Sequence, residues 1–206
     1  YDENIIMGSC RLSIFDLSSR GNMPMKDKSG RYFIIYNGEI YNFQELKEKY
    51  KISTFSNSDT EVLIELFAKT GEKIFNEING IYAFILFDKN KGKVYCVRDR
   101  LGVKPLYYYK KDNNYFFSSE IKGILKIFNE ITINEKIVKF YLQSTYYDFS
   151  EETFFQDINQ VSQGTYHVYD LKTKVSKKIK YWDLNNKKDY NEDFNLIKKY
   201  YFNSFS

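Results

Sequence analysis

The sequence predicts an α+β fold in which sheets are sandwiched between helical layers. Three observations lead to this prediction: hairpin-linked strand patterns in the middle of the chain, helical patterns on either side of them, and an apolar run over 81–87. A run that is apolar at every position is typical of a strand covered on both faces. With 206 residues, 43% of them hydrophobic, the chain is long enough for one sizeable core.

The first part of the chain alternates strands with helices and loops. A strand is expected over 11–15, and a loop over 20–30 follows. The aromatic run 32–36 predicts a buried strand with Asn37-Gly38 at its end. A helix is expected to follow over 42–50.

The next helix has a clear start signal. Ser58 as N-cap and Glu61 three residues later are typical of a capping box, and Gly71 ends the helix. Its apolar stripe consists of Val62, Leu63, Leu66 and Phe67. A short helical stretch over 72–78 then leads to the buried strand 81–87.

The remainder is a meander followed by helices and a hairpin. We expect strands over 94–98, 105–109 and 115–118, helices over 119–128 and 134–143, a hairpin of 165–169 with 175–181, and a last helix over 193–205. The sequence stops within that last helical pattern and starts at Tyr1, so we expect a fragment cut at both ends.

Composition excludes several classes of protein. The net charge of +4 arises from 31 basic and 27 acidic residues that are interspersed along the chain. Because no block of like charges is long enough to follow a phosphate backbone, a nucleic-acid partner is not indicated. No apolar stretch approaches the roughly 18 residues of a membrane span, and no signal peptide is visible. We expect a cytoplasmic protein without a membrane partner.

Cysteine and histidine usage narrows the chemistry. Cys10 and Cys96 show no C-x-x-C spacing, which favours two unpaired, buried thiols over a disulfide framework. His167 is the single histidine and alternates with its neighbours in a strand-like run, as a satisfied structural residue does. A metal site built on two or three histidines is excluded, and so is any Ser-His-Asp triad without His167.

The best candidate for chemistry is the pair Asn37 and Gly38. An Asn side-chain amide beside a bare Gly N–H offers the two adjacent donors that hold the oxyanion of an acyl-transfer intermediate. The alternative is that Asn-Gly is only a turn.

Three charged residues suit a small zwitterionic substrate. Arg11 could clamp a carboxylate with its bidentate fork. Asp59, in the first turn of its helix, could pair with an ammonium group, and Glu39 flanks the Asn-Gly pair. The alternative for each is surface ion pairing or helix capping.

Several motifs in one order carry a family resemblance. They are Arg11-Leu12-Ser13-Ile14, Tyr36-Asn37-Gly38-Glu39-Ile40-Tyr41-Asn42, Ser58-Asp59-Thr60-Glu61, Arg98-Asp99-Arg100-x-Gly102-Val103-Lys104-Pro105-Leu106-Tyr107 and Ser119-Glu120-Ile121-Lys122. The chain resembles the glutaminase domain of glutamine-hydrolysing asparagine synthetases, which are class II glutamine amidotransferases.

The resemblance implies a four-layer αββα sandwich of the N-terminal-nucleophile hydrolase type and a site for glutamine. In that family a cysteine that is the first residue attacks the glutamine amide. Asn37 and Gly38 would hold the oxyanion, and Asp59 with Glu39 nearby would hold the ammonium group. The glutamine carboxylate would be bound by Arg11, with the main chain of Leu12, Ser13, Ile14 and Phe15 lining the pocket.

The same resemblance implies a domain division. Residues 1–184 would be the glutaminase domain without its N-terminal segment, and 185–206 a linker and the start of a helix leading to an absent synthetase domain. That domain would use ATP and Mg²⁺ to amidate aspartate, whereas this chain itself would need no cofactor or metal. Because the family's cysteine would lie in a segment preceding Tyr1, the chain by itself is expected to be inactive.

Two alternatives stay open at this point. The chain could belong to a non-catalytic relative that serves as a binding or scaffold domain, or to an amidotransferase that acts on another carboxylate. The family often forms homodimers, although no feature of this sequence demands one.

Overall fold

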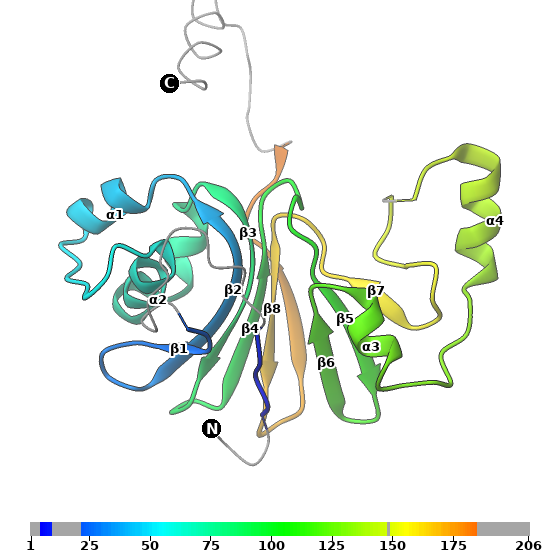
Figure 1. Cartoon of the computed structure of the whole chain (residues 1–206), viewed down its shortest axis with the longest axis horizontal. Helices are drawn as coiled ribbons and strands as arrows, with labels where there is room; N and C mark the ends of the chain where they lie inside the picture. The colour runs from blue at the N-terminus through cyan, green and yellow to red at the C-terminus, as the bar shows by residue number, and fades with distance from the viewer. Residues whose placement is uncertain (1–4, 10–21, 148, 185–206) are drawn as a thin grey trace, which may run out of the picture.

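The computed structural model describes residues 5–9, 22–147 and 149–184, and these form four layers (Figure 1). The described strands are β1 (Met25–Lys26), β2 (Tyr32–Ile40), β3 (Gly80–Asp88), β4 (Lys93–Arg98), β5 (Tyr107–Lys111), β6 (Asn114–Ser118), β7 (Ile158–Gln160), β8 (Thr165–Asp170) and β9 (Ser176–Lys180). The described helices are α1 (Phe43–Lys49), α2 (Asp59–Thr70), the 3₁₀ helix η2 (Gly71–Asn76), α3 (Ile121–Leu125) and α4 (Glu135–Ser144).

Two antiparallel sheets form the middle of the sandwich. The larger sheet has the order β1-β2-β3-β4-β8-β9, and the smaller one the order β6-β5-β7. Helices α1 and α2 lie on the side of the larger sheet, and α3 and α4 on the side of the smaller one (Figure 1). The structure therefore confirms the predicted four-layer αββα sandwich.

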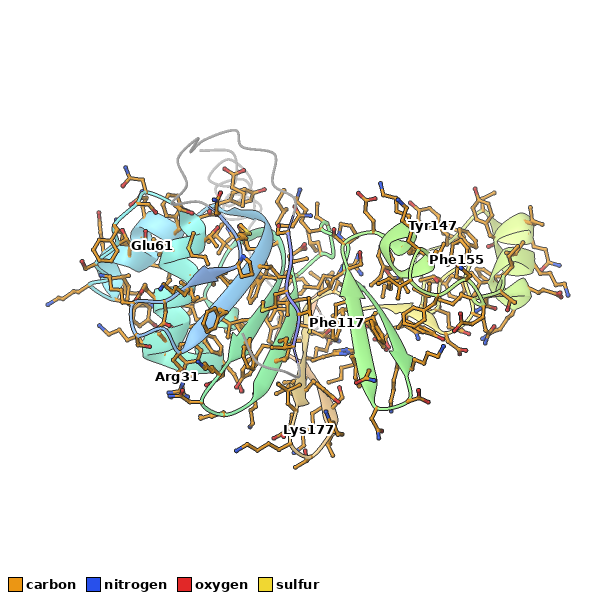
Figure 2. The ribbon with its side chains drawn as sticks, turned by 60° about the horizontal axis from the view of Figure 1, so that its bottom comes forward. Arg31, Glu61, Phe117, Tyr147, Phe155 and Lys177 are labelled. Atoms are coloured by element: carbon orange, nitrogen blue, oxygen red, sulfur yellow. The ribbon has the colours of Figure 1, made fainter. Side chains whose placement is uncertain are left out.

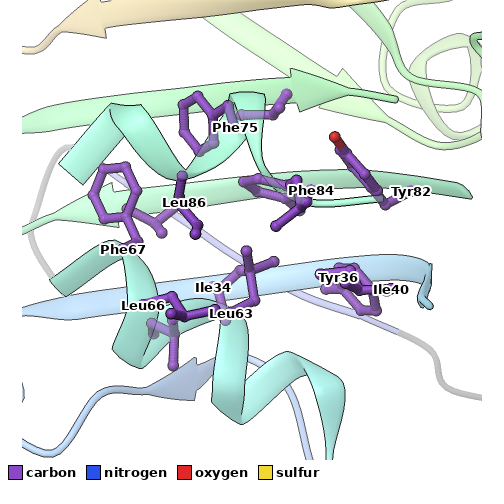
Figure 3. Packing of buried hydrophobic residues seen from close by; sticks show 14 of the residues in the cluster. Ile34, Tyr36, Ile40, Leu63, Leu66, Phe67, Phe75, Tyr82, Phe84 and Leu86 are labelled. Atoms are coloured by element: carbon purple, nitrogen blue, oxygen red, sulfur yellow. The ribbon is translucent and has the colours of Figure 1, made fainter. Parts of the chain in front are cut away.

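Burial explains how these layers hold together. On the outer face of the larger sheet, alternate residues of β2 and β3 pack against α2 and η2, with Phe67, Phe75 and Phe84 at the centre (Figure 3). Phe75 has no exposed surface, and its ring centroid lies 5.6 Å from that of Phe67 and 5.8 Å from that of Phe84. Ring pairs at these distances add specific packing energy to the burial of apolar area.

The inner faces of the two sheets meet in a second apolar layer. Phe33, Phe87 and Cys96 of the larger sheet share this layer with Leu106, and Phe117 of the smaller sheet packs against it (Figure 2). Cys96 is a free thiol with no exposed surface, and burial raises its pKa well above the usual range.

His167 of β8 lies in the same inner layer, as expected for a structural residue. It is 6% exposed, and its ring meets that of Tyr108 edge-on at 5.3 Å. Its Nε2 has no hydrogen-bond partner in the part of the chain that the structure describes, so the expectation of a fully satisfied histidine is wrong.

The N-terminus of α2 confirms one half of the predicted capping box. The Ser58 hydroxyl accepts a hydrogen bond from Thr60 N at 3.2 Å, so Ser58 is the N-cap. The Glu61 carboxylate does not return to Ser58; it accepts from the backbone N–H groups of Phe55 and Ser56, both at 2.7 Å. Glu61 thus fixes the loop that enters the helix, because the chain bends back over the first turn.

The position of Asn37-Gly38 differs from the prediction. β2 does not end there but continues in register with β3 to the pair Ile40↔Gly80, so Asn-Gly lies inside a strand. An Asn-Gly pair signals a turn on local grounds, but here the ladder with β3 continues because Gly38 permits a close approach of the two backbones.

Other elements were missed or lie outside the described residues. The two-residue β1 and the three-residue β7 were not predicted, since neither is long enough to show a periodic pattern. The expected strand 11–15 and helix 193–205 fall outside the described residues, as does Cys10. Within the described ranges, no helix has the length and apolar character needed to cross a bilayer.

Candidate functional site

The candidate site is built on the second half of β2. Side chains alternate along the strand: Phe33 and Ile35 belong to the inner layer, whereas Tyr36 and Ile40 face the helices. Asn37 continues the inner-layer series and is exposed, so its amide is free to meet a ligand at the end of that layer.

Gly38 is required by the contact between β2 and β3. It is paired with Tyr82, and a Cβ at Gly38 would lie 2.1 Å from the Ile81 carbonyl oxygen and 2.6 Å from Tyr82 Cα. Its φ of +149° is also one that other residues rarely adopt. No other residue fits at this position without moving β3.

The direction of the Gly38 N–H follows from the ladder. Lys89 N bonds to Arg31 O, and Tyr41 N bonds to Asn79 O, so the odd-numbered residues of β2 bond to β3. The even-numbered residues therefore point their N–H groups away from β3, toward the β1 edge. Tyr36 N meets Met23 Sδ there at 3.2 Å, whereas the Gly38 N–H has no partner among the described residues.

Asp59 reaches the same edge from the first turn of α2. Its Oδ2 accepts hydrogen bonds from the Tyr36 hydroxyl at 2.7 Å and from Ile40 N at 3.1 Å. Because N–H groups two residues apart on one strand edge are roughly 7 Å apart, the carboxylate is bonded one repeat further along this edge than the Gly38 N–H. The structure thus brings Asp59 to the two residues, Tyr36 and Ile40, that flank Gly38 on the same side of the strand.

In the hydrogen bond between Tyr36 and Asp59, the proton belongs to the Tyr36 hydroxyl. Burial, and after it the charge of Asp59 and the hydrogen bond to it, raise the pKa of Tyr36 far above its usual value. The phenol therefore donates, and Asp59 keeps further acceptor capacity on its oxygens. A carboxylate with free lone pairs at a strand edge can accept a substrate ammonium group.

The placement of the predicted site residues is mixed. Asn37, Gly38, Glu39 and Asp59 come together around one strand segment, although the Asn37 and Glu39 side chains leave β2 on the opposite face from Tyr36. Residues 11–15, which include the predicted carboxylate ligand Arg11, lie outside the described residues. No three His, Cys, Asp or Glu side chains of the described part gather as metal ligands.

Arg98 and Asp99, for which no role was predicted, lie behind the site. Both are almost fully buried, at 5% and 1% exposure. The Arg98 guanidinium donates to the carbonyl oxygens of Gly102, Lys104 and Val161, and so joins the two sheets. The sequence signal that could have identified these two residues is a charged pair at the end of an apolar strand.

A hollow of about 280 Å³ lies beside the ends of β2 and β3. Its lining includes Tyr41, Gly80, Ile81, Arg100 and Trp182. Since Ile81 pairs with Glu39 and Gly80 with Ile40, the hollow adjoins the candidate site.

Comparison with known proteins gives one family and several relatives. The family model described as a glutamine amidotransferase domain matches residues 1–182. A Methanocaldococcus jannaschii protein, provisionally named asparagine synthetase (glutamine-hydrolysing) 2, is 39% identical over 198 residues, which cover 88% of this chain and 38% of that protein. The glutamine-hydrolysing asparagine synthetase 2 of Bacillus subtilis is 34% identical over 180 residues, 84% of this chain and 24% of that protein.

Solved structures give the fold. The glutamine phosphoribosylpyrophosphate amidotransferase of B. subtilis, in complex with ADP and GMP, aligns with a TM-score of 0.57 at 17% identity, covering 82% of this chain and 34% of that one. The described chain thus spans well under half the length of the relatives and structures that it matches.

Proposed function

Because this chain belongs to the family of class II glutamine amidotransferase domains, we propose that it binds glutamine at the β2 edge and that its parent protein hydrolyses the glutamine side-chain amide. One observation carries the proposal: the Gly38 N–H points away from β3 and has no partner among the described residues, with the exposed Asn37 amide next to it and the Asp59 carboxylate bonded to Ile40 N further along the same strand edge. Two donors and one acceptor in this order match the oxyanion and the ammonium group of a glutamine undergoing acyl transfer.

Each residue then has one role. Asn37 Nδ2 and Gly38 N hold the oxyanion, and Asp59 accepts the substrate ammonium with Glu39 contributing negative charge. Arg11 binds the glutamine carboxylate, and the main chain of 12–15 lines the pocket. The roles of residues 11–15 rest on the family resemblance alone.

The nucleophile is not supplied by the described residues. Cys96 is the free thiol among them, but it has no exposed surface and burial disfavours its thiolate. We therefore propose that a free N-terminal cysteine of the parent protein attacks the amide, its own amino group serving as the base.

The released ammonia is proposed to serve a second domain of the parent. The similarity to glutamine-hydrolysing asparagine synthetases supports aspartate as the acceptor, activated by ATP with Mg²⁺. Residues 1–184 would be the glutaminase domain, and 185–206 would lead into the synthetase domain. A cytoplasmic location and a homodimer are parts of the same proposal that rest on the resemblance.

The test is Asn37→Ala in the full-length parent, with Asn90→Ala as the matched control because Asn90 is exposed in the turn after β3. Losing one oxyanion donor is expected to cost about 3 kcal/mol, or on the order of 100-fold in glutamate release. Ammonia-dependent asparagine synthesis should persist in both variants.

Two outcomes would contradict the proposal. A joint loss of glutaminase and ammonia-dependent activity in Asn37→Ala would mean that Asn37 is structural. The absence of glutamate release from a folded, cysteine-bearing wild-type parent would instead favour a binding or scaffold domain.

A further inference from the structure

The buried carboxylate of Asp99 replaces a main-chain carbonyl as the acceptor of one hydrogen bond in the larger sheet. β4 ends at Arg98, yet the next residue, Asp99, still donates its N–H to Tyr82 O at 2.8 Å, as the ladder with β3 requires. The reciprocal bond does not go to the Asp99 carbonyl, which accepts from Gly164 N at 2.8 Å. Tyr82 N donates instead to the Asp99 side chain, at Oδ2, over 3.2 Å.

The same carboxylate organises the loop that leads to the second sheet. Asp99 Oδ1 accepts from Leu101 N and Val103 N, both at 3.0 Å, and Oδ2 accepts from Lys104 N at 2.9 Å. Its two oxygens thus accept four backbone N–H groups, which holds both the loop and β3 in one geometry. Since Asp99 is 1% exposed, water cannot replace these bonds.

The β3 residue that Asp99 holds is the one opposite Gly38. Gly38 and Tyr82 form a register pair, and the β3 backbone is so close that a Cβ on Gly38 would lie 2.6 Å from Tyr82 Cα. Gly38 therefore rests directly on the main chain of Tyr82. A shift of that main chain moves Gly38 with it.

The Tyr82 side chain is tied to the same place. Tyr82 has no exposed surface, its hydroxyl lies 2.9 Å from that of Tyr181, and the Tyr181 hydroxyl donates to Arg98 O at 2.7 Å. Both the backbone and the side chain of Tyr82 are thus anchored at the end of β4, which leaves little freedom for β3 behind the site.

We propose that Asp99 is a positioning residue for the oxyanion site: it fixes Tyr82, and through Tyr82 it fixes Gly38 and the adjacent Asn37. This inference rests on the proposed function of Asn37 and Gly38. Asp99 touches no substrate in this role, because β3 stands between it and β2. Preorganised donors depend on such support, since a small displacement of a reacting group has a large effect on rate.

The experiment is Asp99→Asn in the full-length, cysteine-bearing parent. An Asn keeps one acceptor oxygen but places an NH₂ group against two backbone N–H donors, so the bonds at one carboxylate oxygen are lost. We expect kcat for glutamate release to fall about 10- to 100-fold while KM for glutamine stays near the wild-type value.

Asp27→Asn is the matched control. Asp27 is also buried, at 4% exposure, and its carboxylate also accepts backbone N–H groups, from Tyr32 at 2.8 Å and Ser29 at 3.1 Å. It therefore supports the same strand, β2, at its other end. Asp27→Asn should lower the melting temperature without lowering kcat. Equal losses of kcat in the two variants, in proportion to their loss of stability, would reduce Asp99 to a structural residue.

Hydrogen–deuterium exchange gives a second readout that does not depend on activity. Backbone amides over 36–42 should exchange faster in Asp99→Asn than in wild type and Asp27→Asn. If they do not, the inference is overturned even where kcat falls. If the wild-type parent releases no glutamate, the proposed function fails, and the exchange result alone decides whether Asp99 positions Gly38.

Discussion

The two helical layers of the sandwich differ sharply in how much they bury. Helix α2, over the larger sheet, buries five apolar side chains: Val62, Leu63, Ile64, Leu66 and Phe67. Helix α4, in the opposite layer, buries only Ile137, while Leu142 is 75% exposed. The aromatic residues around α4 instead contact one another, as Phe140 and Phe149 do at 4.1 Å.

This difference matters because the candidate site is attached to the well-buried half. Asp59 is the first residue of α2, and its contacts with Tyr36 and Ile40 join that helix to the strand that carries Gly38. The opposite half carries Tyr147 and Phe155 (Figure 2), and none of its described residues belongs to the site. Burial is thus greater in the layer that supports the oxyanion donors, which need preorganisation.

The largest expected effect is a contrast between two phenylalanines. Phe75→Ala should lower the free energy of unfolding by about 4 kcal/mol, because the ring is fully buried among other rings. Phe128→Ala, at 8% exposure beside Tyr109 and Phe116, should cost about 3 kcal/mol, because the thinner layer can collapse onto the space. Urea-induced unfolding of the chain measures both. Equal costs would show that the two layers are equally well packed.

Much of this fold could be predicted from local patterns. The apolar run that became β3 and the stripe of α2 were read correctly, since burial on one or both faces leaves a period in the sequence. The strand end at Asn37-Gly38 was placed wrongly because turn propensity is local, whereas the continuing ladder depends on β3, more than 40 positions away.

The site was predictable only in part. Asn37, Gly38 and Asp59 were singled out as donors and acceptor, but no spacing rule places an α2 carboxylate on the N–H of Ile40. Asp99 was missed for a similar reason. Its role depends on replacing a main-chain acceptor for Tyr82, which is a property of the tertiary structure rather than of a sequence pattern.

A pH-dependent loss of stability is expected from His167, which lies in the inner layer between the two sheets. Burial, and to a lesser degree the charge of Lys178, lower the pKa of His167, although Glu151 acts in the opposite direction. Cys96 of β4 and Tyr108 of β5 also face the imidazole, and both are neutral there.

The sign follows from proton uptake. Below the ordinary pKa of 6.5 the unfolded chain binds a proton at His167 before the folded chain does, so the free energy of unfolding falls as the pH falls. Above that pH the residue contributes no pH dependence. Melting temperatures between pH 8 and pH 5 should therefore decline less in His167→Gln than in wild type. Parallel curves for the two proteins would show that acid unfolding begins elsewhere.

The smallest effect is expected on the exposed face of α4. Leu142→Ala should change the free energy of unfolding by no more than about 0.5 kcal/mol, because Leu142 is 75% exposed and Ala favours a helix. The midpoint of urea unfolding measures this change. A loss of unfolding free energy comparable to that of Phe128→Ala would mean that the apolar face of α4 is covered in solution. The contrast between the two helical layers would then hold only for the described residues and not for the whole protein.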